Sequence, residues 1–483
     1  MVRKWRENGL WADMADGAFA RLRRGAVPRM DKRSDLTTGG ILYKLVAVAL
    51  PIMGTQFMQM LYNLTDLFWL GRLSAADVAA SGASGMYMWL GMAPMLIGRM
   101  GAEIGVSQNK GRGDVGAAKA YAQNAWLLSL ALGALYGAAL AFFSGPLLSV
   151  FNIQEPYVAG GAVGYLSIVG LGIPAAYMTG ALTGAFNGSG NSRVPFYANA
   201  AGLAINIVLD PVMIFTMGFG IRGAAAATIL AQWVVFALLL AAAKRHKDRP
   251  FVSLRLFVRP CWGKMGQIAR WSLPIAMESG LFTMLTMAVT RLVAGFGSDA
   301  LAVTRVGSQM ESLSWLIGGG FGTAVTAFVG QNFGAMKWDR INKGFRISTA
   351  AMLAWGAAVT AALLFGGYAL TGLFLHEHSL KALGADYARI LSACQLAMCL
   401  EAVGSGMFRG TGRTVQPSAV SIVSNVARVP LCYLLATTPL GVYGAWWGVT
   451  ATAILRSATI YAWASLSLWR RGNSVHQKLL QKC

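Results

Sequence analysis

The chain has 483 residues, of which 55% are hydrophobic and only 12% are charged. Soluble domains carry about 25% charged residues, so this composition excludes a disordered chain and a nucleic-acid-binding domain. The 5 cysteines and 4 histidines show no metal-binding spacing, which argues against a structural zinc site and a disulfide framework. Because a bilayer-spanning helix needs about 20 apolar residues, the chain is predicted to be an all-α polytopic membrane protein.

Long apolar segments predict twelve transmembrane helices. Their expected ranges are 41–70, 78–108, 118–144, 157–186, 195–217, 223–243, 265–295, 300–330, 343–368, 383–408, 416–438 and 443–469. A basic arm (1–40) precedes them, in which residues 10–22 are predicted either to form an amphipathic helix on the membrane surface or to be disordered. A polar cytoplasmic linker (244–264) separates an N-terminal six-helix bundle (41–243) from a C-terminal one (265–469), and residues 470–483 form a tail.

Positive charge falls mainly on one side of this arrangement. Most of the 41 Lys and Arg residues lie in the arm, in the loops near 110–119, 244–264 and 337–346, and in the tail. Since basic residues are retained in cytoplasmic loops, both termini are predicted to face the cytoplasm, with the protein in the inner membrane of the cell. The same rule explains the net charge of +22 without a nucleic-acid partner.

The two halves resemble each other, in the same order, at a separation of about 223 residues. The matched segments include Leu50–Ile52 with Leu273–Ile275, Gln108–Gly111 with Gln331–Gly334, and Phe186–Gly190 with Phe408–Gly412. Six spans in each half place both halves in the membrane the same way up, related by a pseudo-two-fold axis along the membrane normal. Two bundles that rock about a central cleft are typical of a transporter with alternating access. The alternative is a duplicated scaffold with another role.

Five polar side chains of the first half are expected to meet in the outer half of the membrane. They are Asp66 in span one, Tyr165 in span four, Asn206 and Asp210 in span five, and Thr228 in span six. A buried carboxylate costs about 2.5–3.5 kcal/mol on insertion scales, so it needs a function or a partner. The second half has no acidic residue at the equivalent positions, so a single cation site is predicted. Pro211 is expected to leave a backbone carbonyl near Ile207 free to help hold the cation.

Further motifs occur in a fixed order along the chain. They are Pro51 and Asp66 in the first span, Leu70–Leu73, Gln108–Asp114, the repeated glycine motifs Phe186–Ser192 and Gly406–Thr414, Asn425–Pro430, and Gly441–Gly448. Together they resemble the MATE family (multidrug and toxic compound extrusion), and in particular its DinF-like and archaeal branch. The resemblance covers nearly the whole chain. It implies a secondary active antiporter that exports organic, cationic or amphiphilic compounds in exchange for H⁺ or Na⁺, with no cofactor beyond that ion.

The resemblance also implies roles for the polar residues. Asp66 and Asp210 would be the pair that takes a proton or binds Na⁺, while Asn206 and Thr228 would supply neutral oxygens. Tyr165 matches the family site more loosely. Pro51 would be a hinge at which the first span bends. The alternative is that the two aspartates only hydrogen-bond neighbouring helices.

Glu278, Glu401 and Met53 are candidate residues of the substrate cleft. The two glutamates do not stand at the positions of the carboxylates that some MATE branches use in spans seven and ten. Each is expected either to contact a cationic substrate or to pair with an arginine within the spans. Met53 belongs to a group of methionines that suit either an adaptable cleft or plain packing. Arg99 and Glu103, four residues apart, are expected to pair on one helix face.

Two other functions remain as alternatives or are excluded. A lipid-linked oligosaccharide or lipid flippase of the same broad superfamily stays open, because Arg99, Arg291, Arg305 and Arg428 lie within spans and could bind phosphate. An enzyme is not expected, since no P-loop and no nucleophile–histidine pair is present. The predicted partners are a small-molecule substrate and the lipid bilayer, and the protein is expected to be a monomer.

Overall fold

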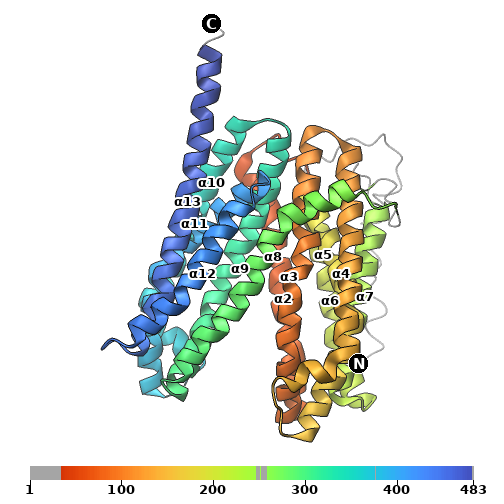
Figure 1. The fold of residues 1–483 in the computed structure, drawn as a ribbon, viewed down its shortest axis with the longest axis vertical. Helices are drawn as coiled ribbons and strands as arrows, with labels where there is room; N and C mark the ends of the chain where they lie inside the picture. Colours follow the sequence, from red (N-terminus) through yellow and green to blue (C-terminus); the bar gives the residue numbers. More distant parts are fainter. Residues whose placement is uncertain (1–33, 246–250, 252–257, 376, 481–483) are drawn as a thin grey trace, which may run out of the picture.

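The computed structural model describes residues 34–245, 251, 258–375 and 377–480. These residues form twelve α-helices and one short π-helix (Figure 1). They are α2 (Ile41–Leu73), α3 (Ala75–Arg112), α4 (Val115–Ser149), α5 (Pro156–Gly188), α6 (Arg193–Pro211), η2 (Val212–Thr216), α7 (Gly220–Arg245), α8 (Trp262–Ala294), α9 (Ser298–Gly334), α10 (Trp338–Gly372), α11 (His378–Gly410), α12 (Val415–Ala436) and α13 (Val442–Leu480). Each predicted span falls on one of these helices, which confirms the all-α fold. The segment 10–22 lies outside the described residues.

Most helices run several residues past the predicted spans. The largest difference is at the end of the chain, where α13 continues to Leu480. Most of the segment predicted as a tail, residues 470–483, is therefore helical, and its place outside the membrane stays a prediction. Hydropathy locates the apolar stretch of a helix, but a helix continues into polar sequence wherever its backbone hydrogen bonds can be satisfied.

Short polar caps explain why the long helices reverse direction so abruptly. Ser74 precedes α3, and its Oγ accepts a hydrogen bond of 3.0 Å from the backbone N–H of Asp77. At the other end of α3, Gly113 has a φ of 79°, a left-handed conformation that favours glycine. Asp114 then caps α4 by accepting a hydrogen bond of 2.8 Å from the N–H of Ala117. Two residues therefore suffice to end one span and begin the next.

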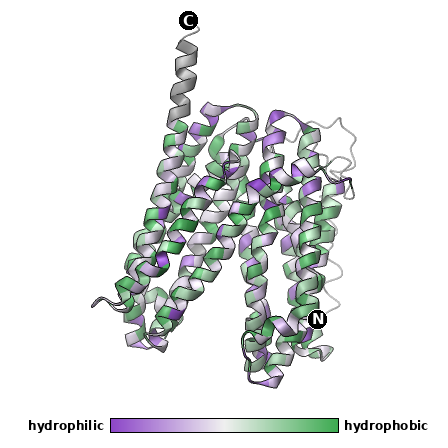
Figure 2. Cartoon of the chain, in the orientation of Figure 1, coloured by the Kyte–Doolittle hydropathy of each residue, from purple (hydrophilic) through white to green (hydrophobic). Residues whose placement is uncertain are grey.

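Hydropathy is distributed as expected for a multi-pass membrane protein. Among the described helices, ten are long and apolar enough to cross a membrane, and α3 and α13 are not among them. Polar residues of α3, such as Glu103, Gln108 and Asn109, are buried inside the protein instead. Figure 2 shows hydrophobic residues along the lengths of the helices and hydrophilic residues gathered at their ends. The helices thus present an apolar surface to lipid while α3 carries polar groups within the bundle.

The two halves touch at one end and diverge toward the other (Figure 1). The end at which they touch carries the α3–α4 and α9–α10 turns, whose sequences near 110–119 and 337–346 are rich in Lys and Arg. We therefore call it the basic end. There, Leu45 and Ile52 of α2 pack in one core cluster with Phe321 and Phe328 of α9. Symmetrically, Ile268 of α8 lies in a cluster built mainly from the N-terminal half. The first helix of each half therefore packs against the second helix of the other half.

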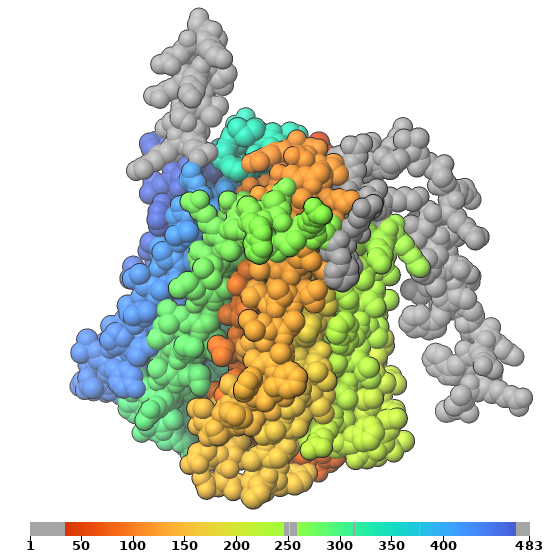
Figure 3. All heavy atoms as spheres, turned by 45° about the vertical axis from the view of Figure 1, so that its right-hand side comes forward, coloured from red at the N-terminus to blue at the C-terminus, as the bar shows by residue number. Residues whose placement is uncertain are grey.

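This exchange is visible in the space-filling view. In Figure 3 the first part of α8, drawn in green, lies across the orange helices of the N-terminal half. α8 contacts α3 far more extensively than it contacts α9, its neighbour in sequence, and α2 likewise contacts α9 more than α3. At the same time α2 packs on α6, and α8 on α12, within their own halves. These two helices hold the molecule together at the basic end.

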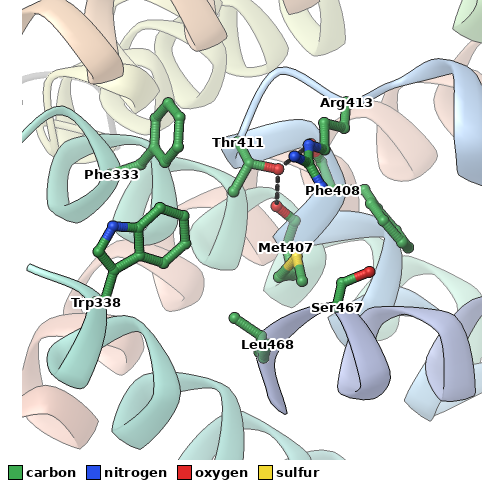
Figure 4. Close-up of a pocket in the computed structure, with 8 residues that line it drawn as sticks. All are labelled: Phe333, Trp338, Met407, Phe408, Thr411, Arg413, Ser467 and Leu468. Atoms are coloured by element: carbon green, nitrogen blue, oxygen red, sulfur yellow. Dashed lines mark hydrogen bonds between the residues drawn. The ribbon is translucent and has the colours of Figure 1, made fainter. Parts of the chain in front are cut away.

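A small pocket opens at the basic end of the C-terminal half (Figure 4). It is lined by Phe333, Trp338, Met407, Phe408, Thr411, Arg413, Ser467 and Leu468. The Oγ1 of Thr411 donates back to the carbonyl of Met407, one turn earlier in α11, at 3.1 Å. None of the polar residues predicted to bind the cation lines this pocket, so it plays no part in the candidate site.

Candidate cation site

Four helices bring the five predicted cation-site residues together. Asp66 lies on α2, Tyr165 on α5, Asn206 and Asp210 on α6, and Thr228 on α7. The Oγ1 of Thr228 donates a hydrogen bond of 3.1 Å to Oδ2 of Asp66. The Nδ2 of Asn206 donates one of 3.0 Å to Oδ1 of Asp210. Residues from four separate helices thus form a single site, as their common depth predicted.

The two carboxylates of this site face each other. Asp66 and Asp210 lie within hydrogen-bonding reach, and both act electrostatically on the Tyr165 side chain. Asn206 and Asp210 are fully buried, Thr228 and Tyr165 nearly so, and Asp66 is half-buried. Two ionised carboxylates at this separation repel strongly away from water. The arrangement therefore needs a proton or a cation between them.

Three oxygen atoms of the site are buried and receive no hydrogen bond from any residue that the structure describes. They are Oδ1 of Asp66, Oδ2 of Asp210 and Oδ1 of Asn206. A buried acceptor without a partner costs free energy, so most such atoms in proteins are satisfied. Carboxylate and amide oxygens are the ligands that hard cations prefer. The donor set fits a small cation such as Na⁺, and it equally fits a proton shared between the two carboxylates.

Local backbone structure explains how α6 presents its two side chains. Asn206 and Asp210 are four residues apart, so they lie on one face of the helix and hydrogen-bond to each other. The α-helix ends at Pro211 and continues as the π-helix η2. A proline interrupts the regular backbone pattern, and π-helical turns recur at functional sites. Gly223 of α7 lets the two backbones approach, because a Cβ there would lie 2.6 Å from the carbonyl oxygen of Met213.

Sequence reasoning missed one residue of the site. The hydroxyl of Tyr62 donates a hydrogen bond of 3.1 Å to the carbonyl oxygen of Thr228, the residue whose own hydroxyl bonds Asp66. Tyr62 precedes Asp66 by four residues, so the two share a face of α2. This four-residue spacing is the feature from which Tyr62 could have been predicted as a site residue. It was not specific, because aromatic residues are common in transmembrane helices.

The predicted hinge and the cleft methionine lie in the basic half of α2. The helix runs through Pro51 as a single element, and the Pro51 carbonyl accepts a hydrogen bond of 2.9 Å from Oγ1 of Thr55. Met53 packs against Gly320 of α9, where a Cβ on the glycine would lie 2.8 Å from the Met53 side chain. Met53 therefore sits at the contact between the two halves.

The two glutamates of the proposed substrate cleft have polar partners. Glu401 pairs with Nε of Arg456 at 3.0 Å and accepts a hydrogen bond of 2.6 Å from Ser457. Oε2 of Glu278 accepts a hydrogen bond of 2.7 Å from Ser418. The arginine-pairing alternative is the one that the structure shows for Glu401. Glu278 has no arginine within ion-pair distance among the described residues.

The expected pairing of Arg99 with Glu103 is wrong. Glu103 is fully buried, and within the described part of the chain neither of its carboxylate oxygens accepts a hydrogen bond. Two arginines act on it from a greater distance, Arg99 on its own helix and Arg409 on α11 of the other half. Residues four apart share a helix face, but here both side chains are packed into the bundle, where their directions are set by neighbouring helices.

Comparison with known proteins identifies the family. A model of the MatE family matches residues 51–212 and again residues 274–434. The chain belongs to the MatE family. The two matched segments fall in the two repeated halves, so the family is built on the same duplication. The resemblance to the MATE family is thereby confirmed, whereas the branch within the family stays a prediction, and the protein is a multi-pass membrane protein of this family.

Relatives and solved structures agree with this assignment. The chain is 27% identical over 420 residues to the probable multidrug resistance protein NorM of Thermotoga maritima, covering 86% of this chain and 90% of the relative. It is 26% identical to the multidrug resistance protein PmpM of Pseudomonas aeruginosa, covering 84% and 88% of the two chains. The crystal structure of a MATE protein in the bent conformation matches with a TM-score of 0.86 at 22% identity, covering 92% of this chain and 99% of that one. The structural match concerns the fold.

Proposed function

We propose that this MatE protein is a secondary active antiporter that exports organic, cationic or amphiphilic compounds in exchange for H⁺ or Na⁺. The observation that carries the proposal is the pair Asp66 and Asp210, with three buried oxygens that lack a donor in the described part of the chain. Relatives named multidrug resistance proteins support export as the direction and drugs as the class of cargo. No chemical step on the substrate is part of this function.

The proposed orientation follows from charge. The basic end faces the cytoplasm, with both termini on that side of the inner membrane, because Lys and Arg are retained there. The halves touch at the basic end and diverge toward the other end (Figure 1). In this orientation the structure corresponds to an outward-facing state, and the aspartate pair lies nearer the outside. One chain holds both halves and the whole site, so a monomer suffices.

The aspartate pair couples ion entry to a change in the first half. A cation from outside enters between Asp66 and Asp210 and is held by Asn206 and Thr228, which relieves the repulsion between the carboxylates. Because Asp66 is on α2 and Asp210 on α6, the bound cation draws these two helices together. A bend of α2 at Pro51 then alters the contact between the halves, and the substrate is released outward. The substrate cleft would be lined by Met53 and Glu278, with Glu401 acting through its pair with Arg456.

The ion gradient supplies enough free energy for export. One charge that crosses 100 mV provides about 2.3 kcal/mol. A difference of one pH unit adds about 1.4 kcal/mol. Together, ~3.7 kcal/mol sustain a gradient of roughly 500-fold for a neutral substrate at one-to-one exchange. Nucleotide hydrolysis is therefore not required.

Transport in liposomes tests the proposal. The purified protein is reconstituted, and efflux of a cationic dye is followed under a pH gradient without Na⁺ and under a Na⁺ gradient at constant pH. Asp66→Asn and Asp210→Asn should each abolish gradient-driven transport, because each removes a charge that the cation needs, while the unfolding temperature stays near that of the unmodified protein. Asp299→Asn, at an exposed aspartate of α9, is the matched control. Full transport by both site variants would reject the site.

A lipid or lipid-linked oligosaccharide flippase is the second candidate. The observation in its favour is Arg428, a nearly buried cation of α12 whose Nε hydrogen-bonds only the hydroxyl of Thr452 among the described residues. A cationic cleft would suit a phosphate group. Binding of a lipid pyrophosphate in preference to cationic dyes would favour this function over drug export.

A further inference from the structure

Two glutamines join the halves at the basic end through reciprocal hydrogen bonds. Nε2 of Gln108 on α3 donates to the carbonyl oxygen of Gly410 on α11, at 2.9 Å. Nε2 of Gln331 on α9 donates to the carbonyl oxygen of Gly188 on α5, also at 2.9 Å. Gln108 and Gln331 are equivalent positions of the repeat, and so are Gly188 and Gly410. We call these four residues the glutamine latch.

The backbones beside the latch are in direct contact. A Cβ on Gly111 would lie 1.9 Å from the carbonyl oxygen of Gln331, and a Cβ on Gly334 would lie 1.9 Å from that of Gln108. No side chain fits at either position while α3 and α9 keep this distance. The two glycines therefore allow the closest approach of the halves, and they allow it at both equivalent positions.

The donors and acceptors of the latch are buried while the two halves are in contact. Gln108 is 5% exposed and Gln331 only 1%, and the glycines at both acceptor ends are buried. A buried carbonyl that loses its donor is costly unless water replaces it. Since water reaches these groups only when the halves separate, the bonds hold the halves together until the basic end opens.

A segment before the first helix secures one side of the latch. Oε1 of Gln331 accepts a hydrogen bond of 3.0 Å from the backbone N–H of Leu36, whose side chain is buried. Asn332 and Arg340 donate to the Leu36 carbonyl oxygen at 3.1 and 3.2 Å. On the other half, Lys110 donates to the Ser34 hydroxyl at 3.1 Å. This strap, residues 34–38, therefore bridges α3 of one half and α9–α10 of the other.

A buried glutamate, Glu103, lies next to the latch. Glu103 of α3 is acted on by Arg409, the residue before the latch glycine Gly410. A Cβ on the other latch glycine, Gly188, would lie 2.4 Å from the backbone carbonyl oxygen of Glu103. Glu103 and Arg409 come from opposite halves.

We propose that Gln108 and Gln331 are the gate residues of the cytoplasmic side, and that both hydrogen bonds must break before the protein can face inward. This inference rests on the alternating-access function proposed above. Gln331 is the stronger half of the latch, since its side chain holds the Leu36 strap as well as Gly188. The gate is separate from the aspartate pair, which lies in the outer half of the membrane.

Pulsed electron paramagnetic resonance on the full chain in liposomes measures the gate directly. Spin labels are attached at Gly116→Cys in α4 and Lys343→Cys in α10, two exposed positions on opposite halves near the basic end. Cys261 and Cys483 are replaced by serine, and the remaining cysteines are buried and so protected from labelling. The distance between the two labels reports whether the basic end is closed or open.

Loss of a latch bond should populate a longer distance. Gln108→Ala should raise the ratio of open to closed molecules about tenfold, and Gln331→Ala by more, because it also releases Leu36. Gly111→Ala should shift the distribution furthest, since its methyl group cannot fit between α3 and α9. The matched controls are Gly85→Ala and Gln309→Ala. Gly85 lies in the same helix as Gly111, and a Cβ there would meet nothing within 4 Å. Gln309 is an exposed glutamine of α9.

The outcomes separate this inference from the proposed function. If the latch variants keep the short distance of the unmodified protein, the glutamines do not hold the gate, whatever the Asp66 and Asp210 variants do. If the controls shift as far as the latch variants, the change is unspecific and the inference is again wrong. Longer distances in the latch variants together with full ion-driven transport by the aspartate variants would support the gate and reject the ion site.

Discussion

Thr228 links α7 to the Asp66 carboxylate through one hydrogen bond of 3.1 Å. Thr228→Val keeps the shape of the side chain and removes the hydroxyl. Because a hydrogen bond to a charged group contributes about 1.5–3 kcal/mol, we expect the cation concentration for half-maximal transport to rise about tenfold or more. Thr228→Ser should restore most of the affinity. The measurement is dye efflux against external Na⁺ or H⁺ concentration.

The control for this residue is Thr286→Val on α8. Its hydroxyl bonds only to the backbone of its own helix, and its side chain is exposed. An equal loss of ion affinity in both valine variants would mean that Thr228 has no particular role in holding the cation.

The residues of the candidate site could be predicted because charge in a membrane is costly. Asp66 and Asp210 stand out in an apolar sequence, and their depths in the spans placed Asn206, Thr228 and Tyr165 beside them. A tyrosine in a membrane-spanning helix carries no such energetic cost, so the sequence did not distinguish Tyr62 from the other aromatic residues. Glu103 did stand out, but the prediction that it pairs with Arg99 was wrong, because helices distant in sequence form its surroundings.

At the scale of the helices, glycines set how closely α5 can approach α3. A Cβ on Gly184 would lie 2.1 Å from the backbone oxygen of Arg99, whereas one on Gly160 in the same helix meets nothing within 4 Å. Gly184→Ala should therefore separate the two helices and lower the free energy of unfolding by about 1–3 kcal/mol. The unfolding temperature in detergent reports this change.

Gly160→Ala is the matched variant in α5, and we expect it to leave the unfolding temperature unchanged. If both alanine variants unfold at the same temperature as the original protein, the contact between α3 and α5 is looser than its geometry indicates.

The helices were predictable as elements, but their ends and irregularities were less so. The apolar segments located all twelve described α-helices, although α3 and α13 are not apolar enough to count as membrane spans. The extension of α13 to Leu480 lies in polar sequence, from which hydropathy does not predict a helix. Pro211 marked a disturbance in α6. The π-helix that follows it depends on how closely α7 packs at Gly223, which the local sequence does not specify.

For the whole molecule, the orientation in the membrane can be tested with a native cysteine. Cys261 is exposed near the start of α8, at the basic end. In a chain with Cys483→Ser, a membrane-impermeant thiol reagent should label Cys261 in inside-out vesicles and leave it unlabelled in intact cells. The reason is that the basic end is proposed to face the cytoplasm.

The reverse pattern is expected on the opposite end. With Cys261→Ser, a cysteine introduced by Gln154→Cys, at an exposed position between α4 and α5, should be labelled in intact cells. Labelling of Cys261 from outside the cell would invert the proposed orientation and with it the direction of transport.

The repeat gave the two halves and their parallel orientation, but not the exchange of α2 and α8 between them. Helix length and order do not say which face of a helix meets which neighbour. The exchange depends on glycines and small side chains at contacts such as Met53 with Gly320, whose partners lie in the other half.

The reciprocal bonds of the latch have the form of an isologous contact, in which one surface patch meets its own copy across a two-fold axis. Two identical six-helix subunits, inserted the same way up, would make both bonds without any further change of sequence. The aspartate pair has no such counterpart, because its equivalent positions carry no acid. Closure of the basic end therefore uses matching surfaces of both halves, whereas the proposed cation site belongs to one half. A change of the proposed coupling ion would therefore require substitutions in the N-terminal half alone and would leave the latch unchanged.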